Sequence, residues 1–284
     1  MQTVNTLDML RNKLAALRAN GSTIGLVPTM GALHEGHLTL MRQANSACDH
    51  VVASIFVNPT QFGQNEDLDA YPRQLADDSA MLEAEGASLL WAPTLEAMYP
   101  DGFASSISVE GVSAEFCGAS RPGHFDGVAT VVCKLFNQVQ PDQAFFGEKD
   151  FQQLAVIRQM ARDLDLSAPF ADNIIGVPTV REPDGLAMSS RNRYLSAENR
   201  QAAATLPQAM KQAIARIAAG ESVAAALDEF EKRLLAGGFD SIDYAALADT
   251  RSLAVITQFD GKPARMLVAA RIGGTRLIDN FPVE

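Results

Sequence analysis

Two histidines three residues apart stand between a strand-like segment and a helical one, in PTMGALHEGH (28–37). At this spacing His34 and His37 share one face of a helical first turn. A helix N-terminus offers free N–H groups and a positive dipole end, and two imidazoles there suit a phosphate that gains charge. The spacing therefore indicates a phosphate site. A zinc pair has less support, because His50 and His124 lack ligand spacing, and two solvent-facing histidines are the remaining alternative.

Two further segments carry cations and hydroxyls. Lys149, in GEKD (147–150), can reach a phosphate as a point charge, although a solvated turn has the same composition. Ser189, Ser190, Arg191 and Arg193 put two hydroxyls and two guanidinium groups close together, which is typical of phosphate binding. The alternative is a polar loop that leads to a helix cap at Ser196.

Amides and acids form a fourth group. Asn58 and Gln61 follow a predicted strand and could hydrogen-bond a small polar ligand. Four acids follow them, Asp67, Asp69, Asp77 and Asp78, and the adjacent pair Asp77 and Asp78 could hold Mg²⁺ through water. Two solvated acids in a first helical turn explain Asp77 and Asp78 equally well. We interpret His124, in SRPGHF (120–125), as a structural residue.

Together these groups fit an ATP-dependent ligase better than a hydride-transfer enzyme. No G-x-G-x-x-G follows the first predicted strand, and the chain contains no G-x-x-x-x-G-K-[ST].

The elements that must position these residues alternate between short apolar strands and helices, which predicts βαβ units. Strands are expected at 23–28, 50–57, 87–92, 143–146 and 174–180, and helices at 7–18, 36–47, 79–85 and 151–164. Residues 128–136 fit either state. The fold class is α/β: a Rossmann-like, doubly wound parallel sheet with a smaller α+β C-terminal domain. Ligands of such sheets bind beyond the carboxyl ends of the strands, where the polar segments stand.

The pattern changes after about residue 180. Alanine-rich helices are expected at 201–218 and 223–235, and strands at 241–248, 265–270 and 276–279, with a Gly273-Gly274 hairpin turn. We expect a boundary within 176–182. The domains would be 1–178, binding nucleotide, and 179–284, closing over that site.

The chain has 284 residues, with 23 Lys and Arg against 34 Asp and Glu and a formal charge of −11. This balance argues against a nucleic-acid partner. No apolar run is long enough to span a bilayer, and no secretory signal is evident, so no membrane partner is expected. Three widely spaced cysteines (Cys48, Cys117 and Cys133) suggest neither disulfides nor zinc, and the expected location is the cytoplasm.

Five long motifs resemble the pantothenate synthetase family (pantoate–β-alanine ligases) of the HIGH-type nucleotidyltransferases. They are PTMGALHEGH, SIFVNPTQFG, SRPGHFDGVATVV, FGEKDFQQL and GLAMSSRNRYL, with RLIDN (276–280) near the end. The resemblance runs from about residue 23 to 206. It implies a nucleotide-binding fold similar to that of class I aminoacyl-tRNA synthetases.

The resemblance also implies a reaction. ATP and pantoate give pantoyl adenylate and pyrophosphate, and β-alanine then displaces AMP to give pantothenate. The family is homodimeric and cytoplasmic, with Mg²⁺ near the phosphates beside an acidic pair that Asp77 and Asp78 match.

The matching positions imply a set of site residues. His37, as proton donor, and His34, Lys149 and Arg191 would be catalytic. Gln61 and Gln153, with Asn58 beside them, would hold pantoate and β-alanine. The ATP site would comprise Met30, Gly31, Ala32, Leu33, His34, Glu35, Gly36, His37, Gly147, Glu148, Lys149, Asp150, Val180, Met188, Ser189, Ser190 and Arg191.

Two positions depart from the family's pattern. The loop before SRPGHF commonly reads L-E-G, whereas this chain has Phe116-Cys117-Gly118, so the role of an acid there is in question. The 167–172 stretch is a few residues longer than usual. Two other functions compete with the ligase: an adenylyltransferase of the same superfamily, against which the amide set argues, and a nucleotide-sensing module that would bind ATP without making AMP.

Overall fold

The computed structural model describes residues 1–63 and 68–283, and its chain forms two compact units. Asp67, one of the acids singled out above, lies outside the described residues. The first unit comprises Met1–Val109, Arg121–Glu148 and Gln153–Pro178. The second comprises Glu110–Ser120, Lys149–Gln152 and Thr179–Glu284. Two short segments that precede residue 178 in the sequence are thus part of the second unit.

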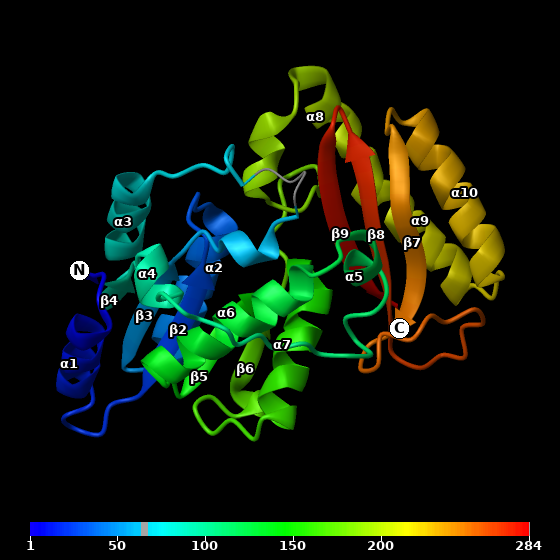
Figure 1. The fold of residues 1–284 in the computed structure, drawn as a ribbon. Helices are drawn as coiled ribbons and strands as arrows, with labels where there is room; N and C mark the ends of the chain where they lie inside the picture. Colours follow the sequence, from blue (N-terminus) through cyan, green and yellow to red (C-terminus); the bar gives the residue numbers. More distant parts are fainter. Residues whose placement is uncertain (64–67, 284) are drawn as a thin grey trace. The chain divides into compact units, whose positions relative to one another are not determined.

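The first unit is built on a parallel sheet whose described strands run in the order β1-β4-β3-β2-β5-β6 (Figure 1). They are β1 (Gln2–Val4), β2 (Ile24–Thr29), β3 (His50–Ile55), β4 (Leu89–Trp91), β5 (Gln143–Gly147) and β6 (Ile174–Val177). Counted from β2, this is the 3-2-1-4-5 order of a Rossmann half-sheet, with β1 added at the edge. The predicted Rossmann-like parallel sheet is therefore confirmed.

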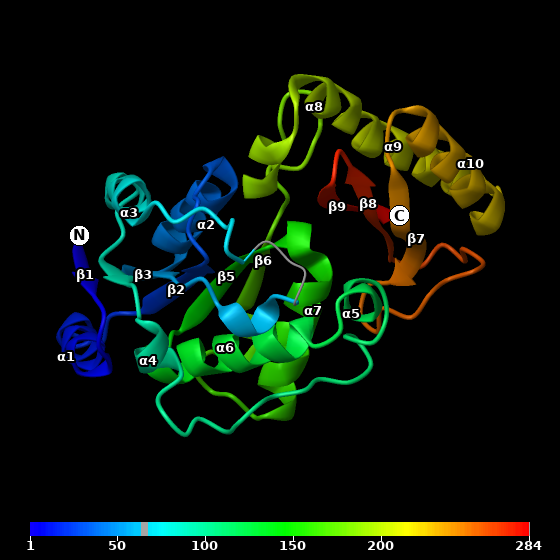
Figure 2. The same cartoon turned by 45° about the horizontal axis from the view of Figure 1, so that its top comes forward.

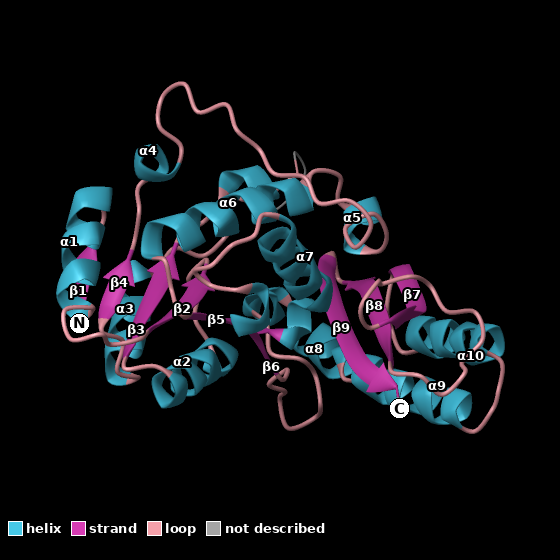
Figure 3. Ribbon diagram, turned by 90° about the horizontal axis from the view of Figure 1, so that it is seen from below, coloured by secondary structure: helices cyan, strands magenta, loops and turns pink. Residues whose placement is uncertain are grey.

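Helices cover both faces of this sheet, with α1, α6 and α7 on one face and α2 and α3 on the other (Figures 1 and 3). Their bounds are α1 (Leu7–Leu17), α2 (Glu35–Ala47), α3 (Leu75–Ala84), α4 (Leu95–Met98), α6 (His124–Val139) and α7 (Phe151–Asp163). The segment at 128–136, which fitted either state, lies within α6. That helix is buried along most of its length, and this explains why residues 128–136 are almost entirely apolar.

Strand β2 lies at the point where the direction of winding reverses. It pairs with β3 from Ile24↔His50 to Thr29↔Ile55, and on its other side with β5 at Gly25↔Gln143 and Leu26↔Ala144. In open parallel sheets the crevice at the carboxyl ends of two such strands is the usual ligand site. The histidine segment follows β2, so the fold places it at this crevice.

The second unit contains an antiparallel sheet in the order β7-β8-β9, formed by β7 (Ser241–Asp249), β8 (Ala264–Ile272) and β9 (Thr275–Val283). Gly273 and Gly274 make the predicted hairpin turn with φ of 54° and 77°, values that glycine adopts without strain. Helices α9 (Thr205–Ala218) and α10 (Val223–Ala236) lie along one face (Figure 2). Phe230, Met210 and Met266 are buried in the core between them. The predicted smaller α+β unit is confirmed.

Some boundaries differ from the predictions. β6 ends at Val177 instead of residue 180, because Pro178 has no N–H for a ladder hydrogen bond. The helix expected at 201–218 is two helices, α8 (Ala197–Ala203) and α9, that meet at Ala204. Pro207 cannot donate back to the carbonyl of Ala203, so it must lie in a first helical turn. The stretch at 167–172 leads into a short 3₁₀ turn, Ala171–Asn173.

Candidate active site

The histidine pair opens α2 directly after β2. His34 is the N-cap, and its Nδ1 accepts a hydrogen bond from Gly36 N at 3.1 Å, while His37 Nδ1 accepts from His34 N at 3.3 Å. In each neutral ring the proton is therefore assigned to Nε2, which becomes the donor. The ring centroids are 4.2 Å apart. The helix end thus presents two neighbouring N–H donors from half-buried imidazoles.

Glycine at position 36 is required by the ring of His34. A Cβ added there would lie 2.8 Å from His34 Cε1, closer than real contacts allow. Gly31 adopts φ of +80°, and its Cβ would lie 2.9 Å from Asp78 Oδ2. Both glycines of the motif are needed to let side chains pack against the backbone of this loop.

Asp78, on α3, holds the same loop in place through hydrogen bonds to its backbone. Its carboxylate accepts hydrogen bonds from Ala32 N and Leu33 N, both at 2.9 Å, and from Gln74 Nε2 at 3.2 Å. The residue is only 1% exposed. The sequence predicts that this residue lies near the phosphates and Mg²⁺, and that role stays a prediction; in the structure its carboxylate holds the loop that carries His34.

Asp77 and Asp78, the acidic pair expected near Mg²⁺, have different surroundings in the structure. Asp77 is exposed in the first turn of α3, and Asp78 is engaged by backbone N–H groups. No three His, Cys, Asp or Glu side chains gather in a metal-binding arrangement in the described ranges. Mg²⁺ that is held through water by one or two carboxylates needs no such group, so the role of this pair toward Mg²⁺ stays a prediction.

Asn58 and Gln61 are brought together in the 3₁₀ turn Pro59–Gln61, which follows β3. Asn58 Nδ2 donates to Gln61 Oε1 and to Gly127 O, both at 3.1 Å. Asn58 Oδ1 accepts from the hydroxyl of Tyr99 at 2.8 Å, and burial raises the pKa of Tyr99, so this donor stays protonated. Asn58 is thus held by hydrogen bonds to Gly127 and Tyr99, and it in turn orients the side chain of Gln61.

Gln61 faces the histidine segment, since its Nε2 lies 3.1 Å from Met30 Sδ. Helix α6 packs closely against this turn at Gly127, where a Cβ would stand 2.4 Å from Thr60 O. Met30 and Gln61, far apart in sequence, are therefore neighbours in the structure. Gln153 lies in the first turn of α7 with a partly exposed side chain.

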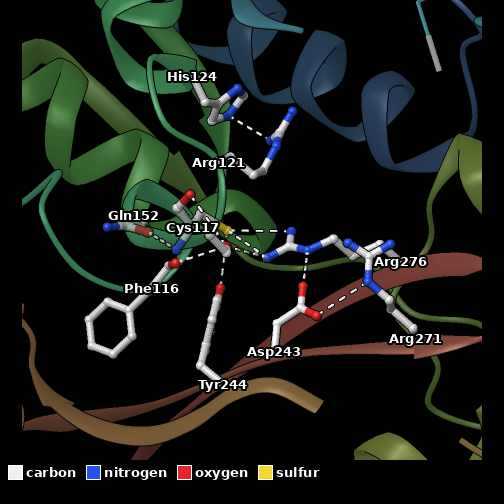
Figure 4. A network of polar contacts seen from close by, with 10 residues as sticks. Phe116, Cys117, Arg121, His124, Gln152, Asp243, Tyr244, Arg271 and Arg276 are labelled. Atoms are coloured by element: carbon white, nitrogen blue, oxygen red, sulfur yellow. Dashed lines mark hydrogen bonds and ion pairs between the residues drawn. The ribbon is translucent and has the colours of Figure 1, made fainter. Parts of the chain in front are cut away.

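His124 and Arg121 form a further part of this arrangement that sequence reasoning missed. His124 Nδ1 lies 2.8 Å from Gln61 O, and a carbonyl only accepts, so Nδ1 carries the proton. His124 Nε2 then accepts from Arg121 Nη1 at 2.8 Å, as Figure 4 shows. The imidazole links Arg121 to the backbone of Gln61. The only signal in the sequence was a polar loop before a helix, which does not identify its partner.

In the second unit, Lys149 lies in the 3₁₀ turn Glu148–Asp150 after β5. Its Nζ is 3.7 Å from Asp150 Oδ2, and its carbonyl accepts from Asn280 Nδ2 at 2.9 Å. Gly147 and Glu148 belong to the first unit. The GEKD segment therefore contributes residues to both units.

Val180 and the segment from Met188 to Arg191 are held together in the second unit. Met188 N donates to Val180 O at 3.0 Å, and Ser189 Oγ caps the 3₁₀ turn Ser190–Tyr194 by accepting from Arg191 N at 3.3 Å. The segments that carry Lys149 and Arg191 thus both lie in this unit, and hydrogen bonds hold the backbone of each.

Cys117, where the family commonly has an acid, belongs to a polar network of the second unit (Figure 4). Its Sγ lies 3.1 Å from Tyr244 Oη and 3.6 Å from both Nη atoms of Arg276. Asp243 accepts from Arg276 Nε at 2.6 Å and supplies the negative charge. The arginine thus has a carboxylate partner although the residue at 117 is a cysteine.

The parallel sheet, its switch point and the histidine pair define an α/β nucleotide-binding protein. The family model of pantoate–β-alanine ligases matches residues 2–282. A pantothenate synthetase of Novosphingobium aromaticivorans is 65% identical over 283 residues, covering 100% of this chain and 99% of that protein. One from Rhizorhabdus wittichii is 61% identical over 284 residues, covering 100% and 99%. The chain belongs to the pantoate–β-alanine ligase family and is an enzyme of the ligase class.

Solved structures agree with this assignment. A crystal structure of pantothenate synthetase from Thermus thermophilus matches with a TM-score of 0.91 and 49% identity, covering 100% of this chain and 99% of that one. A pantoate–β-alanine ligase from Francisella tularensis, complexed with β-γ ATP and β-alanine, matches with a TM-score of 0.83 and 33% identity, covering 99% and 97%.

Proposed function

We propose that this enzyme condenses pantoate with β-alanine in two steps at the expense of ATP. A carboxylate oxygen of pantoate attacks the α-phosphorus, the bond to the bridging oxygen breaks, and pyrophosphate leaves. The amine of β-alanine then attacks the acyl carbon of pantoyl adenylate, loses a proton and displaces AMP. The observation that carries the proposal is the pair of Nε2–H donors at the N-terminus of α2, beside the switch point of the sheet.

The first step must bring two anions together. His34 and His37 can donate hydrogen bonds from Nε2–H to phosphate oxygens as charge accumulates there, and the His37 donor can stabilise the leaving pyrophosphate without giving up its proton. Lys149 and Arg191 would add positive charge from the second unit. The protein contributes mainly position and electrostatics, because no covalent bond to the enzyme is needed.

Gln61 and Gln153 are proposed to hold pantoate. Neutral amides can orient the nucleophilic carboxylate without an ion pair that would lower its reactivity. Gln61 suits this role because Asn58 fixes its Oε1 and Met30 lies beside its Nε2. Asn58, buried and fully engaged, would act on pantoate and β-alanine through Gln61.

Three finer expectations belong to this proposal. Mg²⁺ would arrive with the phosphates of ATP, which supply the oxygen ligands that it prefers. The enzyme would act as a homodimer in the cytoplasm. The described part of the chain has three free thiols, which a reducing compartment favours: Cys48, Cys117 and Cys133. Separately, no helix within the described ranges has the length and hydropathy of a bilayer span.

Isotope exchange tests the two steps. We expect labelled pyrophosphate to enter ATP when pantoate is present and β-alanine is absent. AMP should appear only when all three substrates are supplied. Exchange that requires β-alanine would reject the separate adenylate. An adenylyltransferase would show no exchange dependent on pantoate, and a nucleotide-sensing module would bind ATP without any AMP release.

A further inference from the structure

The last strand of the second unit contacts the backbone of Lys149. Asn280, on β9, is 4% exposed, and its Nδ2 donates to Lys149 O at 2.9 Å. Both residues belong to the second unit, although one lies in the turn after β5. The RLIDN motif (276–280) therefore contacts Lys149, the residue that offsets phosphate charge in the proposed function.

The neighbour of Asn280 fixes it in place. Asp279 is 2% exposed, and its carboxylate accepts two hydrogen bonds from Arg181, at 2.7 and 2.8 Å. The same carboxylate accepts from Asn280 N at 2.7 Å, and Arg181 Nη2 donates to Asn280 O at 3.1 Å. The guanidinium also stacks over Phe281, 3.8 Å from its ring centroid. Asn280 therefore has little freedom to turn away from Lys149.

Arg181 connects this strand with the other cation-bearing segment. It follows Val180, whose carbonyl accepts from Met188 N, and Arg181 Nη1 donates to Gly185 O at 3.0 Å. The loop that leads to Arg191 and the backbone of Lys149 are thus both tied to Asp279 and Asn280.

The rest of the Lys149–Gln152 segment has separate anchors. Arg265 lies over the ring of Phe151, 4.0 Å from its centroid. Gln152 Nε2 donates to Val112 O at 3.0 Å, and Gln152 Oε1 accepts from Cys117 N at 3.0 Å. Loss of Asn280 would therefore release the carbonyl of Lys149 and leave residues 151 and 152 in place.

We propose that Asn280 is a positioning residue that fixes the backbone of Lys149, so that the ammonium is presented to the ATP phosphates in one place. This rests on the proposed function, in which Lys149 offsets phosphate charge. An amide suits the task because Nδ2 donates to a carbonyl without adding charge beside the ammonium. A displacement of a cation by about 1 Å can cost about 10²-fold in rate.

The test is a double-mutant cycle read by the rate of pantoate-dependent pyrophosphate exchange and by ATP affinity from calorimetry. Asn280→Ala should slow exchange by about 10-fold or more, and the KM for pantoate should stay unchanged. In a Lys149→Ala background, which retains the carbonyl, adding Asn280→Ala should slow exchange no further. Asn280→Leu has nearly the same size but neither a hydrogen-bond donor nor a charge, so it should match Asn280→Ala and carries the test if the alanine variant does not fold.

Asn173→Ala is the matched control, because Asn173 Nδ2 also donates to a distant carbonyl, Asp142 O at 3.0 Å, in the first unit. It should exchange at the normal rate. Normal exchange in folded Asn280→Leu, or multiplied losses in the double variant, would overturn the proposal. If the wild-type enzyme shows no exchange, the proposed function fails instead. The cycle is then read from ATP affinity alone, where additive losses would still reject the link between Asn280 and Lys149.

Discussion

At the scale of single residues, the carboxylate of Asp78 determines the shape of the loop that carries the histidines. It accepts two backbone N–H bonds from residues 32 and 33, inside a site where its charge is almost fully shielded from water. A buried carboxylate that accepts backbone hydrogen bonds is hard to replace, because each N–H group would lose its partner without gaining a water molecule. The loop therefore depends on α3, although no residue of α3 needs to contact ATP.

We predict that Asp78→Asn lowers stability by about 2 kcal/mol, because one amide hydrogen would face a backbone N–H. Adenylation should slow, and its dependence on Mg²⁺ concentration should not change. Urea unfolding and a magnesium titration of the exchange rate measure the two effects. Asp77→Asn, on the exposed face of the same turn, serves as the control and should behave like the wild type in unfolding. Rescue of Asp78→Asn by excess Mg²⁺ would show a ligand instead of a brace.

The two glutamines give a second prediction at this scale. Gln61→Ala and Gln153→Ala should each weaken pantoate binding by about 10-fold and change ATP affinity much less, because a hydrogen bond to a charged ligand is worth roughly 1.5–3 kcal/mol. Calorimetry on folded variants measures both affinities. Gln159→Ala, two turns further along α7, should alter neither. Equal losses for the two ligands would mean that the amides are structural.

How much of the site could be predicted depended on where each partner lies in the sequence. His34 and His37 were accessible because three-residue spacing on a helix fixes their relation. The brace at Asp78 and the link from His124 to Gln61 join residues 45 or more positions apart. Such pairs arise from tertiary packing, for which composition and spacing carry no signal.

At the scale of elements, periodicity predicted the βαβ alternation and the hairpin at 273–274, and it failed where elements are short. The edge strand β1 has three residues, too few for a period, and α5 (Cys117–Ser120) has four. The ends of β6 and α8 depend on prolines at 178 and 207. Both prolines are present in the sequence, so these two boundaries could have been predicted from it.

The segment that contains α5 is fastened to the sheet of the second unit through Arg276, which donates to Asp243 at 2.6 Å and to Ser120 Oγ at 3.1 Å. We predict that Asp243→Asn lowers stability by about 2 kcal/mol, because the 15%-exposed guanidinium loses its carboxylate. Thermal unfolding measures this loss. Asp228→Asn removes a solvent-exposed pair with Lys232 and should cause no measurable change. Equal melting temperatures for the two variants would contradict this account of the fastening.

At the scale of the whole molecule, the proposed chemistry divides its cations between two units. His34 and His37 belong to the first, whereas Lys149 and Arg191 belong to the second. An adenylate is easily hydrolysed, so we propose that closure of the second unit completes charge neutralisation and excludes water.

Arg191→Ala is therefore predicted to fold normally and to bind pantoate, with single-turnover adenylation slowed by about 10²–10³-fold. Arg191→Lys should recover only part of the rate, because an ammonium lacks the planar fork of arginine. The exposed Arg233 of α10 offers a control, and Arg233→Ala should keep the full rate. Near-normal adenylation by Arg191→Ala in rapid-quench measurements would exclude the clamp.

The strand order also has a consequence for the time course of folding. β2 at the centre of the parallel sheet pairs with β5, so residue 25 meets residue 143, whereas β8 and β9 are joined by a two-residue turn. Closing a long loop costs more entropy before any contact repays it, and distant pairing slows folding. We expect pulse-labelled hydrogen exchange during refolding to protect amides of β8 and β9 before those of β2 and β5. Simultaneous protection would mean that the chain folds as one cooperative unit. With sequential protection, the hairpin of the second unit would exist before the crevice beside β2 has formed, and the nucleotide site would be among the last features of the native state to appear.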